Sequence, residues 1–149
     1  MNRRVKVLVW LVVVGAVVFA AIQFVPYGRE HENPPVTQEP TWADAETAAL
    51  LRESCYDCHS NETRWPWYSH IAPSSWLLTN DIEDGREALN FSEWAFDEEE
   101  EPFVAVAIEE NVRSGDMPPT RYLLLHPGAR LSDEEKQALV DGVQRSLGE

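Results

Sequence analysis

The stretch Cys55-Tyr56-Asp57-Cys58-His59 contains both cysteines of the 149-residue chain and a histidine directly after the second. This spacing suits two thiols that each add to one vinyl group along a single porphyrin edge. The adjacent histidine can then reach the iron of the same porphyrin from one side. The stretch therefore predicts one covalently attached haem c, bound through Cys55 and Cys58, with His59 as an iron ligand.

Other chemistries of a Cys-x-x-Cys pair fit the surrounding sequence less well. A redox dithiol normally follows a strand of a βαβ unit, whereas residues 42–52 are predicted to be helical. A structural zinc site normally has four nitrogen or sulfur ligands, and no second cysteine pair accompanies the first. A disulfide between these two cysteines would close too small a loop to stabilise the fold much. We expect haem, with a redox dithiol and zinc as the alternatives.

An apolar stretch near the N-terminus predicts a membrane anchor. Residues 7–25 are apolar except for Gln23, and as a helix they would extend about 28 Å, enough to span the bilayer core. Basic residues at positions 3, 4 and 6 precede the stretch and place the N-terminus in the cytoplasm. A cleaved signal peptide is the alternative, although Val18-Phe19-Ala20 is a poor cleavage site. We expect a single-pass anchor in the cytoplasmic membrane and a periplasmic or extracellular haem domain.

The charge of the chain limits its partners. It has 26 Asp and Glu against 12 Lys and Arg, and every acidic residue follows the apolar stretch. Nucleic acid is therefore not an expected partner, because its phosphates would be repelled. A redox protein with a basic docking face would be attracted. Solubility in a salty medium is the alternative reason for the acidic composition.

Composition divides the chain into three parts. We predict an anchor at residues 1–26, a tether at residues 27–41 and a haem-binding domain at residues 42–149. The tether contains prolines at positions 34, 35 and 40 and no apolar periodicity, which predicts an extended and fairly stiff segment.

The domain is expected to be helical, with little strand signal. The start and stop signals are Thr41 with Asp44, Ser74 or Ser75, Pro102 with Gly115, and Ser132 with Glu135 and Gly148. An N-terminal helix leads into the cysteine motif, and a C-terminal helix closes the chain. We therefore predict an all-α, small cytochrome c-like domain behind one N-terminal transmembrane helix.

Elimination narrows the choice of methionine for the sixth iron ligand. Of the two methionines, Met1 is expected on the cytoplasmic side, which leaves Met117. Met117 stands between Gly115 and Pro118-Pro119, in a loop suited to presenting one side chain to a metal. We predict iron ligation by His59 and Met117. The other possibilities are a histidine, at position 31, 70 or 126, an open sixth position, or Met117 as a buried gap-filler.

An aromatic segment follows the motif. Its aromatic side chains have no helical or strand period. We predict that they pack against the haem ring and contact its propionates; they are Trp65, Trp67 and Tyr68. Arg64 is predicted to pair with one propionate. Core packing is the alternative, above all for Trp67 and Trp76.

The chain outside the anchor resembles the prokaryotic haem-binding domain family of small mono-haem c-type proteins. The resemblance rests on these stretches: Asn33-Pro34-Pro35-Val36, residues 55–63 with Cys-x-x-Cys-His-Ser-Asn-Glu-Thr, Trp65-Pro66-Trp67-Tyr68-Ser69, Ile71-Ala72-Pro73, Ser75-Trp76-Leu77, Asp81-Ile82, Gly85-Arg86, residues 89–92 with Trp94, residues 115–119, and Leu131-Ser132. It implies haem c binding through Cys55, Cys58 and His59, with Met117 as the distal ligand. It implies no reaction, and the polar stretch from Asp81 to Trp94 is more than haem attachment alone needs.

We expect a membrane-tethered electron carrier rather than an enzyme in its own right. The reason is a single haem motif with one well-placed methionine and no visible acid–base constellation. The alternatives are a haem subunit or docking module of a larger oxidoreductase, and a haem peroxidase or gas sensor with an open sixth position. A peroxidase would need a distal acid–base group, for which His70 or Arg64 are the candidates.

Overall fold

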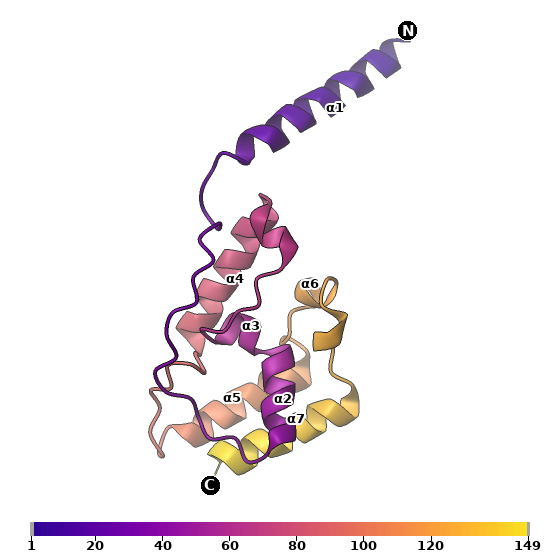
Figure 1. The fold of residues 1–149 in the computed structure, drawn as a ribbon. Helices are drawn as coiled ribbons and strands as arrows, with labels where there is room; N and C mark the ends of the chain where they lie inside the picture. Colours follow the sequence, from indigo (N-terminus) through magenta and orange to yellow (C-terminus); the bar gives the residue numbers. More distant parts are fainter. Residues whose placement is uncertain (1, 149) are drawn as a thin grey trace. The chain divides into compact units, whose positions relative to one another are not determined.

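A computed structural model describes residues 2–148, and within that range the chain is all-α (Figure 1). Gln38 and Glu93 form an isolated parallel bridge, and the described residues contain no strand. The prediction of an all-α chain is confirmed. The elements are α1 (Arg3–Ile22), α2 (Ala45–Ser54), α3 (Tyr56–His59), η1 (Trp67–His70), α4 (Ser74–Ala88), α5 (Glu101–Ser114), α6 (Thr120–Leu123), η2 (Pro127–Ala129) and α7 (Asp133–Leu147).

Helix α1 is long and apolar enough to cross a membrane, and none of its residues is buried in the protein. It ends at Ile22 with Gln23 as its C-cap, before the predicted end at Val25. Pro26 accounts for the earlier end, because the residue before a proline is disfavoured in the helical region. A signal sequence has the same length and composition, so a cleaved segment is still the alternative.

The contacts of the chain define two compact units. The first joins the chain up to Glu32 with Trp65–Glu83, and the second joins Asn33–Arg64 with Asp84–Glu149. Helix α4 contributes residues to both units. The cysteine motif and Met117 belong to the second unit, whereas the aromatic segment belongs to the first.

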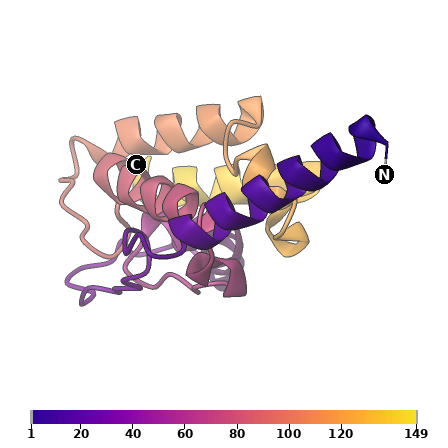
Figure 2. The same cartoon turned by 90° about the horizontal axis from the view of Figure 1, so that it is seen from above.

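The second unit is built around α7. Helices α5 and α2 both pack against α7, and α5 and α7 lie side by side (Figure 2). The buried cluster between these elements and α3 consists of Leu51, Tyr56, Phe91, Trp94, Ala105, Val112, Leu139, Val140, Val143 and Leu147. Tyr56 therefore anchors the cysteine motif in the hydrophobic core.

Most of the predicted helix ends are confirmed. Ser132 and Glu135 form the capping box of α7, and Gly115 has a φ of 79° directly after α5. Helix α4 begins at Ser74, as expected. The N-cap of α2 is a correction, because Asp44 rather than Thr41 accepts the N–H of Thr47, at 2.7 Å.

Candidate haem site

The cysteine motif forms one short helical turn. Cys55 ends α2 and caps α3, and its carbonyl oxygen accepts the N–H groups of Cys58 at 3.2 Å and His59 at 3.0 Å. Side chains three residues apart in a helical turn lie on the same face. The turn therefore brings the two thiols together and places the histidine directly after them.

Neither cysteine forms a disulfide, and both are half-buried. Burial raises the pKa of the Cys55 thiol to about 11, while its contact with the Ser54 hydroxyl, at 3.3 Å, acts in the opposite direction. The Cys55 thiol is thus protonated, and the two thiols are not joined to each other.

The His59 imidazole has a defined orientation. Its Nδ1 lies 3.0 Å from the carbonyl oxygen of Leu89. Because a carbonyl oxygen only accepts, Nδ1 carries the proton and Nε2 has the lone pair that can bind a metal. Burial lowers the pKa of His59, and the carbonyl groups of Leu89 and Gly85 oppose this shift. A half-buried, neutral and oriented imidazole can ligate iron through Nε2.

The end of α4 packs tightly against the motif. A Cβ atom on Gly85 would lie 2.6 Å from the carbonyl oxygen of Cys58, so no larger residue fits without a backbone shift. The next turn supplies the Leu89 carbonyl that His59 uses. Gly85 and Leu89 therefore belong to the site through their backbone atoms, a role that no local sequence signal indicates.

The segment from Arg86 to Ser92 completes this support. Arg86 Nε donates to the Ser60 carbonyl at 2.9 Å, and the N–H of Phe91 donates to the His59 carbonyl at 2.8 Å. Ser92 Oγ accepts the N–H of Asn61 at 3.0 Å. We name residues 85–92 the motif clamp, because they bind the His59 ring and the backbone of residues 59–61. The clamp gives a structural reason for much of the polar stretch between Asp81 and Trp94.

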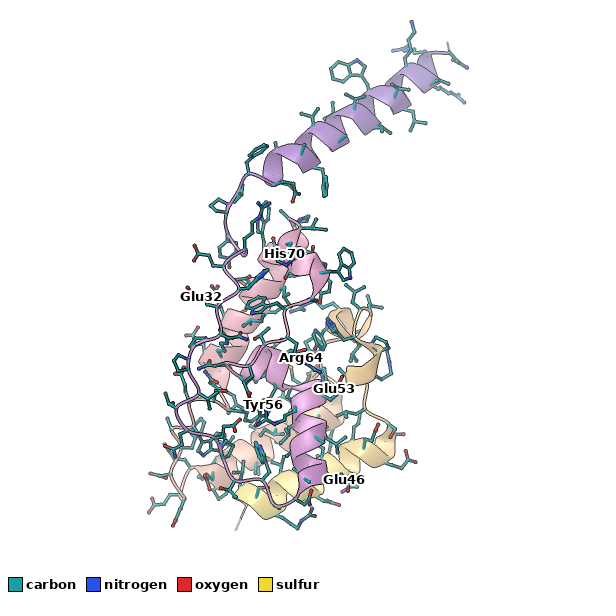
Figure 3. All side chains as sticks on the ribbon, in the orientation of Figure 1. Glu32, Glu46, Glu53, Tyr56, Arg64 and His70 are labelled. Carbon is teal, nitrogen blue, oxygen red and sulfur yellow. The ribbon has the colours of Figure 1, made fainter. Side chains whose placement is uncertain are left out.

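A buried carboxylate lies between the two cysteines. Asp57 accepts Arg64 Nε at 3.1 Å and the Tyr122 hydroxyl at 2.7 Å. Arg64 also pairs with Glu53 at 2.9 Å, and the two residues lie side by side in Figure 3. Hydrogen bonds to Asp57 and Glu53 raise the pKa of Arg64. The pKa of Tyr122 is also raised, mainly by burial and to a lesser extent by the hydrogen bond to Asp57. Arg64 thus supports the motif directly, and its pairing with a propionate stays a prediction.

Met117 lies in the loop after α5 and is half-buried. Its backbone N–H donates to the carbonyl oxygen of Asn111 at 3.1 Å, and this bond fixes the loop to the last turn of α5. Met117 belongs to the same unit as His59, and its ligation of iron stays a prediction.

The aromatic segment has other contacts within the first unit. Trp65 stacks on His31 with ring centroids 4.5 Å apart, and His70 lies edge-on to His31 at the same distance. Trp67 is 72% exposed and contacts Tyr68 edge-on. Core packing is therefore wrong for Trp67, and contact of Trp65, Trp67 and Tyr68 with haem stays a prediction.

His126 lies in the second unit. Its ring stacks on Tyr122 with centroids 3.9 Å apart, and its Nδ1 is 3.1 Å from the Tyr122 carbonyl oxygen. Among residues 2–148, no three His, Cys, Asp or Glu side chains are grouped so that they could hold a metal ion. The donor set at the motif is thus two thiols and one imidazole, which fits a haem.

These features define a helical protein in which one turn presents two thiols and an oriented imidazole, a donor set that suits haem. The chain matches the haem-binding domain family over residues 17–145, and it belongs to that family. Searches of curated proteins and of solved structures found no match.

Proposed function

We propose that this protein is a membrane-tethered mono-haem c-type cytochrome that carries single electrons in the periplasm or at the cell exterior. The observation that carries the proposal is the single turn with two thiols that form no disulfide and an imidazole whose Nδ1 donates to the Leu89 carbonyl oxygen. Family membership supports haem binding. Covalent attachment and electron transfer are inferred from the residues at the site.

Each thiol has a defined part in attachment. Cys55 and Cys58 would each add S–H across one vinyl group, so that one C–S bond and one C–H bond form without an oxidant. The motif clamp would hold the backbone of residues 59–61 during this addition, since its hydrogen bonds reach the carbonyl groups of His59 and Ser60 and the N–H of Asn61. The product is one haem c held by two thioether bonds.

The residues that would ligate the iron would determine the redox behaviour. Haem, when bound, supplies an iron that alternates between the ferric and ferrous forms. The hydrogen bond from His59 Nδ1–H to the Leu89 carbonyl oxygen raises the basicity of Nε2 and fixes the ring orientation. With Met117 as a second protein ligand, its thioether would raise the reduction potential. Neither group needs to transfer a proton, which suits an electron carrier.

The location outside the cytoplasm rests on the N-terminal segment. Helix α1 has the length and composition of a membrane span, and Arg3, Arg4 and Lys6 favour a cytoplasmic N-terminus. The domain of residues 42–149, joined to the anchor of residues 1–26 by the segment 27–41, would then face the periplasm or cell exterior. A redox protein with a basic docking face is the expected partner of this acidic domain.

The test uses the full chain, produced with haem c maturation machinery and purified in detergent. Haem that stays on the denatured polypeptide, with a mass increase of one haem, would establish covalent attachment. Optical spectra are then recorded oxidised, reduced, and reduced under carbon monoxide. A ferric methionine–iron charge-transfer band without a carbon monoxide shift supports the electron carrier. A high-spin spectrum that shifts with carbon monoxide contradicts it and favours a peroxidase or gas sensor, while a stable co-purifying oxidoreductase favours a subunit or docking module.

A further inference from the structure

Trp67 is a large aromatic side chain that the described part of the protein leaves 72% exposed. Phe24, which follows the end of α1, is 88% exposed. Large aromatic side chains, above all Trp and Tyr, are enriched at the interface between a membrane and water. Their surroundings indicate what the contact is.

The residue that caps the end of α1 forms hydrogen bonds with the segment that contains Trp67. The Gln23 side-chain amide donates to the Ala72 carbonyl oxygen at 2.9 Å and accepts the Ala72 N–H at 3.0 Å. Both backbone groups of Ala72 are thus satisfied by one side chain at the C-cap of α1. Residues 67–72 therefore lie close to the point where α1 would leave the hydrocarbon region.

The chain after Gln23 makes further contacts with the same segment. Gly28 has a φ of +75°, and a Cβ there would lie 2.7 Å from the Ser75 carbonyl oxygen. The Tyr27 hydroxyl donates to Glu83 at 3.1 Å, and His31 Nε2 lies 3.1 Å from the Ser69 carbonyl oxygen. Residues 23–31 are thus packed against residues 65–83.

The charge pattern identifies the environment that this segment suits. Residues 65–80 contain no Asp, Glu, Lys or Arg, although the chain carries a net charge of −14. Arg29, whose Nη2 lies 3.4 Å from Gln23 Oε1, is a cation next to the end of α1. Trp and Tyr favour the membrane interface, and a cation there is attracted to lipid phosphates. Carboxylates would be repelled by the same phosphates, and the segment has none.

We propose that Trp67 and Phe24 insert into the headgroup region of the bilayer in which α1 is anchored. The first unit then contacts lipid directly and fixes its own orientation at the membrane surface. The partner is the phospholipid interface itself, for which Trp67 supplies an apolar ring with one N–H donor. This inference rests on the proposed anchoring by α1, and the experiment below separates the two.

The experiment places one nitroxide label at a time on the full haem-loaded chain in phosphatidylcholine vesicles. Covalent haem uses Cys55 and Cys58, so Trp67→Cys provides a single reactive thiol, and the unsubstituted protein gives the labelling background. Phe103→Cys is the matched aqueous control, because Phe103 is 77% exposed on α5. Val12→Cys, in the middle of α1, reports anchoring, and Phe24→Cys is the second test position.

We expect the ratio of oxygen to nickel-chelate accessibility to be several-fold higher at positions 67 and 24 than at position 103. A nickel-accessible label at position 67, with position 12 still in lipid, would overturn the inference and leave the anchoring intact. Labels at position 67 protected from both reagents would mean that protein covers Trp67, such as a second copy of the chain, and would also overturn it. Nickel access at position 12 would overturn the anchoring and the inference together.

Discussion

His59 Nδ1 lies 3.0 Å from the carbonyl oxygen of Leu89, a backbone group thirty positions later in the chain. The bond selects the tautomer with a free lone pair on Nε2 and holds the ring in one orientation. It also couples the motif turn to the end of α4, which no local sequence signal would require. The geometry of the proposed iron ligand thus depends on packing between two separate parts of the second unit.

Met117→Ala should remove the proposed distal iron ligand. We expect loss of the ferric methionine–iron charge-transfer band, a lower reduction potential, and a reduced spectrum that now shifts with carbon monoxide. Optical spectroscopy and potentiometric titration of the full chain measure these effects. His126→Ala and His70→Ala are the controls for the alternative ligands, and an unchanged spectrum in Met117→Ala with a changed one in either control would identify a histidine instead.

Gly85→Ala should displace the motif turn. The new Cβ would lie 2.6 Å from the Cys58 carbonyl oxygen, and a backbone atom cannot rotate away. Overpacking of this kind costs about 1–3 kcal/mol, against about 1 kcal/mol that alanine gains in helix propensity. We expect a less stable protein with lower haem occupancy, measured as haem absorbance per polypeptide.

Gly128→Ala is the matched control for that substitution. Its Cβ would meet only the end of the Glu53 side chain, at 3.2 Å, and that side chain can move. We expect haem occupancy close to that of the unsubstituted protein. Equal losses in both variants would mean that the close approach of Gly85 to Cys58 does not control attachment.

The cysteine motif and the helices were predictable because their signals are local. Capping side chains, Pro102 and Gly115 act within a few residues of the ends that they define. Asp44 was assigned to the first turn and Thr41 to the cap, since both can accept a helix N–H and only the backbone path distinguishes them. The predicted start of α2 is therefore wrong by three residues, while the helix itself is predicted correctly.

The support of the motif was not predictable, because it depends on contacts between distant residues. Arg86 and Ser92 are ordinary polar residues in the sequence, and their hydrogen bonds to Ser60 and Asn61 exist only in the folded chain. Arg64 was assigned to haem because a free arginine near the motif suits a propionate. Its pairs with Asp57 and Glu53 depend on side-chain directions that composition and spacing do not give.

Tyr122→Phe should make stability less sensitive to alkaline pH. Burial and the bond to Asp57 raise the pKa of Tyr122 above its ordinary value of 10.0. The folded protein therefore holds the phenol proton when the unfolded chain has lost it, and this contribution is complete below pH 10 and declines as pH rises further. We expect the thermal midpoint of the full chain to fall less steeply above pH 10 in the variant. An equal slope in the two proteins would exclude Tyr122 as the titrating group.

The crossing of α2 and α7 provides a test of core packing away from the motif. A Cβ on Gly142 would overlap the Thr47 side chain, with Oγ1 as its nearest atom. Thr47 cannot rotate freely, because its Oγ1 donates to the Asp44 cap at 2.8 Å. Gly142→Ala should therefore destabilise the protein by about 1–3 kcal/mol through overpacking. Thr47→Ala alone should also be destabilising, since it removes a buried contact and the bond to the cap.

The double variant Thr47→Ala, Gly142→Ala separates this clash from general damage. Loss of Oγ1 and Cγ2 removes two of the three close contacts of the new methyl group and leaves the Cβ of residue 47 at 2.8 Å, so the double variant should be more stable than the sum of the two single effects predicts. Residues in direct contact show coupling energies of about 0.5–3 kcal/mol, and we expect a favourable value in that range. Thermal unfolding of the haem-loaded full chain, followed by circular dichroism, measures all four proteins of the cycle. Additive effects would mean that α2 moves away from α7 instead of resisting the new side chain.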